Sequence, residues 1–303
     1  MINGLINVYK EKGYTSFDVV AILRGISGQR KIGHTGTLDP DATGVLPIAL
    51  GNATKLCDML TDKSKEYVAT FMLGKRTDTL DISGTVLEQK EVTCTPKDIE
   101  ESIKSFIGGY DQIPPMFSAK WVNGQRLYDL ARKGREVERQ PVFVNIENIE
   151  IVSIELPIVK IRVLCGKGTY IRSLCEDIAK KCGELAVMTE LERTRVMCFD
   201  AESAYKISDL EKLRDEGRLL EAVTPTDSYF YEFSEVKVLE NYRKAIDNGN
   251  KLYKKMVKAD FKPENGQIVR VYRDCGKFMG LYTYNSEEGS YSPYKMFIEP
   301  KED

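Results

Sequence analysis

The sequence predicts an α+β fold with a large domain over residues 1–231 and a small β-rich domain over residues 232–303. Residues 159–165 alternate strictly between apolar and polar, which predicts a half-buried strand. Residues 171–182 instead repeat apolar side chains at spacings of three and four, which predicts a helix. Beyond a linker-like stretch at 223–233, short strand-like segments are separated by Gly and Asn, which is typical of a small β domain.

Further helices are predicted on either side of a strand-rich region. In residues 15–26, Thr15 can cap the helix, Asp18 stands at the capping-box position, and Phe17 opens an apolar stripe. Residues 96–107 begin with a proline, which is favoured in a first helical turn, and end at a Gly-Gly pair. Strands are predicted at 64–74 and 85–89, and a short helix at 235–249.

The composition indicates a cytoplasmic protein. Of the 303 residues 42% are hydrophobic and 30% charged, and no apolar run has the length of a membrane helix. The first residues show no signal or transit pattern, and the seven cysteines contain no C-x-x-C pair, so we expect a reducing compartment and no contact with a membrane. The net charge of −2 excludes a protein that coats nucleic acid by bulk electrostatics, so any RNA contact must be local.

Residues 27–44 contain four glycines and a proline, so we expect no regular secondary structure there. The segment lacks the order of a phosphate-binding loop, and one histidine in the whole chain makes a metal site a weak hypothesis. Asp39, Asp41 and Thr43 have the D-x-D-x-T spacing of aspartyl phosphatases, although the glycine-rich stretch before them does not read as the buried strand that such a site needs. A structural turn remains the ordinary interpretation of the loop by itself.

Several segments taken together closely resemble the TruB family of tRNA pseudouridine synthases, of the bacterial stand-alone type. Residues 31–56, KIGHTGTLDPDATGVLPIALGNATKL, resemble the catalytic motif of that family. The other matching segments are GLINVYKEKGYTS, KEYVATFMLGKRTDTLDISG, PPMFSAKWVNGQRLYDLARKG, GKGTYIRSL and LERTRV. One position departs from the family pattern, because Lys10 is followed by Glu11 where proline is usual, and we expect this to alter local rigidity more than chemistry.

The resemblance implies a mixed, mostly antiparallel sheet and the isomerisation of uridine 55 in the T loop of tRNA to pseudouridine, without a cofactor or metal. It identifies Asp39 as the nucleophile. It identifies Arg172 as the partner of that carboxylate, a role that suits a permanently charged, bidentate guanidinium. Tyr67 is implied to stack on the uracil, and it is a candidate to take the proton from C5.

Four other positions carry supporting roles in the family. His34 matches the histidine that occupies the place of the flipped nucleotide in the T loop. Tyr170 and Leu191 are expected to pack around the uracil, and Lys10 to support the catalytic loop. Asp41 is expected to be a loop carboxylate, because the family accepts other residues there.

The densest positive stretch of the chain falls in an insertion at about residues 118–145, which the family uses as a flexible thumb over the T arm. Relatives that use guide RNA lack much of this insertion, so we expect a monomer that recognises tRNA without guide RNA. The C-terminal domain resembles a PUA-like RNA-binding module. The candidate phosphate contacts are Lys120, Arg126, Arg132, Lys133 and Arg135.

One alternative of a different class remains at this point. A tRNA-binding or tRNA-folding factor without catalytic activity would use the same cleft and the same insertion. It would bind tRNA with strong salt dependence but leave the uridine unchanged.

Overall fold

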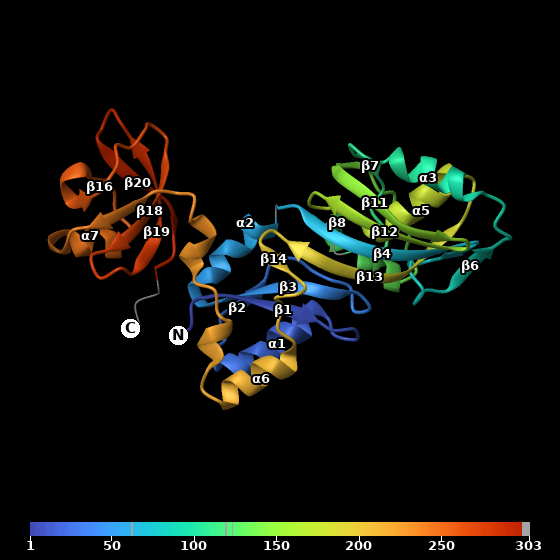
Figure 1. Cartoon of the computed structure of the whole chain (residues 1–303), viewed down its shortest axis with the longest axis horizontal. Helices are drawn as coiled ribbons and strands as arrows, with labels where there is room; N and C mark the ends of the chain where they lie inside the picture. The colour runs from blue at the N-terminus through green and yellow to red at the C-terminus, as the bar shows by residue number, and fades with distance from the viewer. Residues whose placement is uncertain (62, 119, 123, 299–303) are drawn as a thin grey trace.

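The computed structural model describes residues 1–61, 63–118, 120–122 and 124–298. Two sheets organise the chain: a large mixed sheet and, at one end of the molecule, a separate six-stranded sheet. In Figure 1, α1 and α6 lie together at the β1–β3 side of the large sheet, whereas α3 and α5 lie at its other end. The prediction of an α+β protein with a β-rich C-terminal domain is confirmed.

The large sheet has the strand order β1-β3-β13-β4-β12-β11, with β2 added beside β3 and β14 beside β13. Every pairing is antiparallel except that of β3 with β13, where Gly44 lies opposite Arg193. The sheet is therefore mixed and mostly antiparallel, as predicted. Its strands are β1 Gly4–Lys10, β2 Ile32–His34, β3 Thr43–Leu50, β4 Lys65–Leu73, β11 Ile146–Glu155, β12 Ile158–Cys165, β13 Ala186–Val196 and β14 Phe199–Asp200.

Two of the helices begin at a threonine that caps them. Thr15 and Asp18 form a capping box at α1, and Thr95 and Asp98 form one at α3. Alternate residues of β4 and β12, such as Phe71 and Ile161, are buried against α5 and its neighbours in one large core. The helices are α1 Ser16–Ser27, α2 Cys57–Thr61, α3 Pro96–Lys104, α5 Ile171–Lys181 and α6 Ile207–Asp215, with 3₁₀ turns η1 Gly51–Leu56, η2 Leu219–Ala222 and η3 Thr226–Phe230.

Three local predictions are wrong. Residues 27–44 are not wholly irregular, because β2 pairs with the end of β3 and the last two residues of the segment begin β3 itself. The stretch 235–249 begins with strand β15 rather than with a helix. Phe17 does not join the apolar face of α1 and is 69% exposed, whereas Val19 and Val20 are buried.

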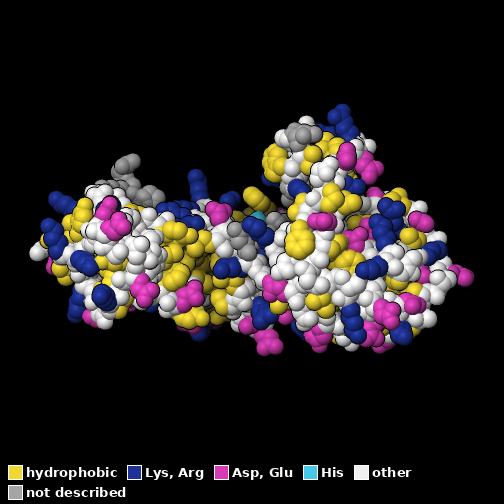
Figure 2. Space-filling view, turned by 90° about the horizontal axis from the view of Figure 1, so that it is seen from above, with side chains coloured by type: hydrophobic (Ala, Val, Ile, Leu, Met, Phe, Trp, Pro, Cys, Tyr) yellow, Lys and Arg dark blue, Asp and Glu magenta, His cyan; other side chains and the backbone are white. Residues whose placement is uncertain are grey.

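The predicted insertion lies between two strands that pair with each other, β7 Tyr110–Gln112 and β10 Val142–Val144. Between them the chain forms a hairpin, β8 Trp121–Val122 with β9 Gln125–Arg126, followed by the short helix α4 Leu127–Arg132. In Figure 2 the insertion projects from the body as a lobe with Lys and Arg side chains at its tip. A second small hairpin, β5 Lys75–Thr77 with β6 Val86–Gln89, follows β4.

The C-terminal sheet has its own apolar core, which includes Val271, Tyr282 and Tyr291. A second cluster, in which Phe230 and Phe297 pack with Leu5 and Val45, joins this domain to the large sheet. Residues 299–303 of the predicted domain lie outside the described part of the chain, and its likeness to a PUA module stays a prediction. Its elements are β15 Glu235–Val238, η4 Glu240–Tyr242, α7 Arg243–Asp247, β16 Leu252–Tyr253, η5 Lys254–Met256, β17 Val257–Lys258, β18 Ile268–Arg273, β19 Phe278–Asn285 and β20 Ser290–Met296.

The parallel junction of the large sheet requires glycine at position 44. Gly44 has φ +105°, and a Cβ there would lie 2.2 Å from the carbonyl oxygen of Arg193. We expect Gly44→Ala to lower the free energy of unfolding by about 2–4 kcal/mol, measured by urea denaturation, because strain and overpacking act together. The matched control is Gly25→Ala, at an exposed position of α1 where a Cβ meets nothing within 4 Å. This substitution should raise the free energy of unfolding by about 0.5–1 kcal/mol. A loss of similar size in both variants would contradict the prediction.

Candidate active site

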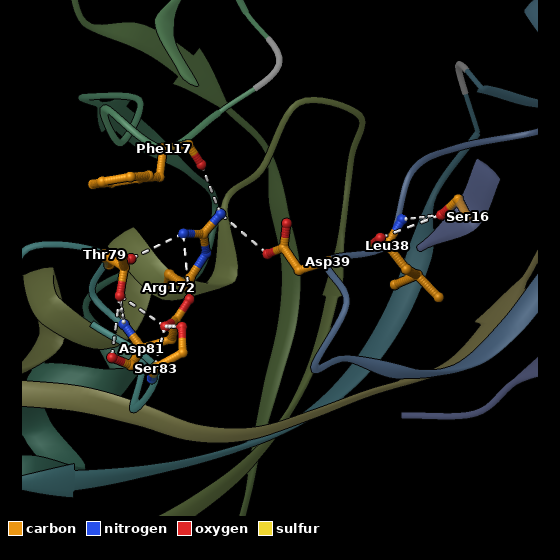
Figure 3. Close-up of polar contacts among 8 residues, drawn as sticks. All are labelled: Ser16, Leu38, Asp39, Thr79, Asp81, Ser83, Phe117 and Arg172. Carbon is orange, nitrogen blue, oxygen red and sulfur yellow. Dashed lines mark hydrogen bonds and ion pairs between the residues drawn. The ribbon is translucent and has the colours of Figure 1, made fainter. Parts of the chain in front are cut away.

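Asp39 lies in a turn that leads from β2 into β3. Hydrogen bonds hold the backbone of the residues before and after it, Leu38 and Pro40. The Ser16 hydroxyl donates to the carbonyl of Leu38 (3.2 Å) and accepts from its N–H (2.9 Å), which ties the turn to the first residue of α1 (Figure 3). The carbonyl of Pro40 accepts hydrogen bonds from the backbone of Gly13 and from Lys10. The Asp39 side chain itself is 43% exposed, so the fixed turn presents an accessible carboxylate.

Arg172 approaches Asp39 from α5 as an almost fully buried cation. Its Nη2 lies 3.0 Å from Oδ2 of Asp39, and its Nη1 lies 3.5 Å from Oδ2 of Asp81. The same two nitrogens donate to the carbonyls of Phe117 and Thr79, each at 2.9 Å (Figure 3). Because the guanidinium is held by four partners, it can fix the Asp39 carboxylate in one orientation.

Asp81 stands behind the arginine in a turn of its own. Its Oδ1 accepts from the hydroxyls of Thr79 (2.7 Å) and Ser83 (2.5 Å) and from the N–H of Ser83 (3.1 Å). These donors leave its other oxygen for Arg172. The two carboxylates therefore flank one cation, and the Asp81 carboxylate supports the arginine from the side away from Asp39.

The position of Arg172 depends on the first residues of α5. The amide of Gln112, a buried residue of β7, accepts from the N–H of Tyr170 (2.8 Å) and donates to its carbonyl (3.0 Å). This pair of bonds fixes the residue that caps α5, two positions before the arginine. Gln112 thus couples the base of the insertion to the site.

A cleft of about 340 Å³ opens beside Asp39, and a second hollow of about 190 Å³ lies on the other side of the Asp39–Arg172 pair. The structure brings most of the predicted pocket residues to the first cleft, whereas Lys10 and His34 are not among the residues that line it. Its wall combines aromatic, aliphatic and charged groups, as expected of a site for a planar base. The lining includes Asp39, Tyr67, Phe117, Tyr128, Tyr170, Arg172 and Leu191.

Tyr67 reaches the cleft from β4 with only 9% of its surface exposed. Burial raises the pKa of its phenol above the ordinary value, and the charge of Asp39 acts in the same direction. The guanidinium of Arg193, a residue that lies directly opposite Tyr67 on β13, acts to lower that pKa. At neutral pH Tyr67 is therefore a neutral phenol.

His34 is the last residue of β2 and precedes the turn that carries Asp39. The N–H of Gly36 donates to its Nδ1 (3.3 Å), which leaves the proton of the neutral ring on Nε2. Burial, followed by the charge of Arg193, lowers the pKa of His34. The ring is therefore neutral at physiological pH, which suits stacking or wedging better than the binding of a phosphate.

Lys10 is the last residue of β1, and it is fully buried beside the turn that carries Asp39. Its Nζ donates to the carbonyls of Tyr14 (2.6 Å), Pro40 (3.1 Å) and Glu11 (3.2 Å). Glu11 stands where the family usually has proline, and the contact uses only its backbone carbonyl, which proline also has. The departure therefore leaves this contact intact.

Burial lowers the pKa of Lys10 from 10.5 to about 8. Between these two values the unfolded chain binds more protons at Lys10 than the folded chain, so this group makes stability rise with pH. We expect the free energy of unfolding of the wild type, relative to Lys10→Met, to increase as pH rises from about 8 to 10.5, measured by urea denaturation at constant ionic strength. Lys12→Met, at an exposed neighbour, is the control, and a pH-independent difference for Lys10→Met would contradict the prediction.

The five basic residues predicted to meet phosphates do not all line one hollow. Arg126, Arg132 and Lys133 border a shared hollow on the insertion, where Arg126 lies over the Trp121 ring and Arg132 over the Tyr128 ring. Arg126 also lines the cleft of Asp39, whereas Arg135 lines a different cleft, between the insertion and α5. Lys120 is partly buried and borders none of these three hollows.

Three residues that hold the site were missed by the sequence analysis: Asp81, Gln112 and Arg193. Asp81 and Arg193 stand inside two of the matching segments, TDTLDISG and LERTRV, so a signal for them existed. Nothing in the local sequence singles out Gln112, whose role depends on a contact 58 residues away.

Within the described residues no group of three or more His, Cys, Asp or Glu side chains could hold a metal ion. No described helix is long and apolar enough to cross a bilayer.

The chain matches family models of pseudouridylate synthases, which are isomerases that act on a uridine base. Residues 24–171 match the model of the TruB family pseudouridylate synthase N-terminal domain, and residues 172–230 match that of the tRNA pseudouridylate synthase B C-terminal domain. The chain belongs to the TruB family.

Similar proteins agree with this assignment. Proteins named tRNA pseudouridine synthase B are 47% identical in Lachnoclostridium phytofermentans and 42% in Clostridium perfringens, each over 98% of this chain and 100% of the relative. Among solved structures, a chain of an H/ACA RNP bound to a substrate RNA containing 2'-deoxyuridine is 26% identical, with a TM-score of 0.70, over 99% of this chain and 86% of that chain.

Proposed function

We propose that this enzyme converts uridine 55 in the T loop of tRNA to pseudouridine, with Asp39 as the nucleophile. The observation that carries the proposal is the Asp39 carboxylate, which is exposed to a base-sized cleft and held 3.0 Å from the buried guanidinium of Arg172. The names of the relatives, which specify tRNA, support the substrate.

The reaction needs few groups, and the cleft contains candidates for each. The N1–C1′ bond of the nucleotide breaks, the uracil turns, and a C5–C1′ bond forms, with no net oxidation and no added group. Asp39 supplies the anion at the sugar–base junction, and Arg172 keeps it in place. Leu191 and Tyr170 confine the loose base, and Tyr67 receives the proton that leaves C5.

A uridine inside a folded T loop must be turned out before it reaches Asp39. We assign to His34 the place that the nucleotide leaves, because its neutral ring lies beside the catalytic turn. The insertion brings Arg126 and Tyr128 to the cleft from the other side. Together these elements hold a flipped nucleotide from both faces, and the basic residues of the insertion meet neighbouring phosphates.

We also propose that the enzyme works on tRNA directly, as a monomer in the cytoplasm, without a guide RNA. The insertion and the C-terminal domain supply RNA-binding surface within one chain. A single purified protein should therefore modify a tRNA transcript when no other RNA is present. Light scattering during size-exclusion chromatography would measure its oligomeric state.

The test uses an unmodified tRNA transcript that carries tritium at uridine C5. The wild type should release tritium to water, and a matched transcript with cytidine at position 55 should release none above background. Release from both transcripts would contradict the choice of position 55. Binding without release from either would instead support the tRNA-binding factor, the alternative from a different class.

The phosphatase interpretation finds no support in the geometry. Asp39 follows irregular chain at 35–38 rather than a buried strand, and Asp41 is exposed. Magnesium-dependent hydrolysis of a phosphate ester that is lost in Asp39→Asn would be the result in its favour.

A further inference from the structure

Arg193 is a buried cation for which the described residues supply no carboxylate. The residue is 1% exposed on β13, and no described Asp or Glu lies within ion-pair distance of its guanidinium. Burying a charge is costly unless a partner compensates for it. The contacts of the Arg193 guanidinium indicate which function this buried charge serves.

The guanidinium connects the two halves of the candidate site. Its Nε donates to the carbonyl of Val45 (2.7 Å) and its Nη2 to the carbonyl of Gly36 (3.2 Å), which are the residues on either side of the turn that carries Asp39. The same side chain lies directly opposite Tyr67 across the β13–β4 pairing, and the two groups interact electrostatically. Arg193 thus faces one ionisable group that can become an anion, and that group is the phenol of Tyr67.

Tyr67 needs such a partner if it is to accept a proton. Its phenol is buried, and the Asp39 carboxylate borders the same cleft, so burial and like charge both oppose a phenolate. A permanently charged guanidinium beside the phenol favours the phenolate. Arg193 acts on Tyr67 in that sense, against burial and against the nearby Cys165 and Asp39.

We propose that Arg193 is the positioning residue that stabilises the phenolate of Tyr67 while Tyr67 takes the proton from C5 of the reattached uracil. This inference rests on the proposed function. In that step the C5–H bond breaks and its proton goes to the Tyr67 oxygen. The electron pair of that bond forms the C5=C6 double bond, and the N1=C6 π pair moves to N1, which takes a proton from solvent. Tyr67 has first given its own phenolic proton to solvent, so the proton from C5 restores the neutral phenol, and protons and electrons balance.

If Arg193 had a purely structural role, its substitution would change the pH dependence of the rate differently. If Arg193 only braced the turn through the carbonyls of Gly36 and Val45, its loss would slow the reaction equally at every pH. If it stabilises the Tyr67 phenolate, removing the charge raises the pKa of that phenol. The rising limb of the pH–rate profile then moves to higher pH.

The experiment measures single-turnover tritium release from C5 of a tRNA transcript between pH 6 and 10. In Arg193→Met we expect release to fall about 10²-fold at pH 7 and to recover toward the wild-type rate at high pH. Arg193→Lys keeps the charge but cannot make the same fork of hydrogen bonds, so it should stay within about tenfold of the wild type. The control is Arg195→Met, on the same strand but paired with Glu66, which should leave the profile unchanged.

The outcomes separate this inference from the proposed function. If the wild type releases no tritium, the proposed function fails. If the wild type is active and both Arg193 variants lose activity by the same factor at every pH, the inference about Arg193 is overturned while the function stands. Circular dichroism checks folding. If Arg193→Met does not fold, Arg193→Lys decides alone, because a large pH-independent loss there indicates bracing and a small loss indicates charge.

Discussion

Asp39→Asn is expected to lower tritium release from uridine C5 of tRNA by on the order of 10⁴-fold or more. The asparagine side chain has nearly the same shape but carries no negative charge, so it cannot attack the sugar–base junction. The Ser16 and Lys10 contacts that fix the turn involve the backbones of Leu38 and Pro40 and should survive. Release is measured in single turnover with enzyme in excess.

A binding measurement distinguishes lost chemistry from lost recognition. Filter binding of the same transcript should give a similar Kd for the wild type and Asp39→Asn, because the predicted phosphate contacts lie on the insertion. Asp41→Asn, two residues further along and exposed, is the matched control and should keep most activity. Substantial release by Asp39→Asn would remove this residue from the role of nucleophile.

The second large effect is expected at Arg172. In Arg172→Met the carboxylates of Asp39 and Asp81 lose their common cation, and the carbonyls of Phe117 and Thr79 lose a donor. We expect tritium release to fall by about 10²–10³-fold, because the carboxylate is no longer held in one orientation. The rate constant for the chemical step should fall much more than the affinity for tRNA.

Substitution of the supporting carboxylate tests whether orientation is the cause. Asp81→Asn leaves Arg172 paired with Asp39 but weakens its support from the other side, so its effect should be in the same direction and smaller. Arg172→Lys keeps the charge without the planar fork and should lie between the wild type and Arg172→Met. If Arg172→Lys matched the wild type, a point charge would suffice and the argument from orientation would be wrong.

Much of the fold could be predicted because its signals are local. The capping box at Thr15 and the proline at position 96 mark two helix starts, and the alternation in 159–165 marks β12. The apolar side chain of Phe17 misled the prediction, because a helical period cannot show which flank of a stripe meets the core. Strand β2 escaped prediction because three residues that include a glycine pair with β3 only through a contact about 15 residues away.

Only some residues of the candidate site could be predicted, because the others act through contacts that are distant in sequence. Asp39, Tyr67 and Arg172 stand in segments that match the family, and the structure places all three around one cleft. The groups that hold them, Gln112 and Arg193, act through contacts between distant segments. No pattern in the sequence shows that Gln112 meets Tyr170 or that Arg193 spans the catalytic turn.

The single parallel pairing in the large sheet has a consequence for the order in which the protein folds. The turn with Asp39 enters β3 opposite β13, and Gly44 and Arg193 meet although most of the large domain separates them in sequence. During synthesis the first strands and α1 leave the ribosome long before β13 does. Such distant pairings close slowly, so Asp39 reaches its partners only after the rest of the large domain is made. Nascent fragments therefore carry the turn with Asp39 without the geometry that the proposed reaction needs.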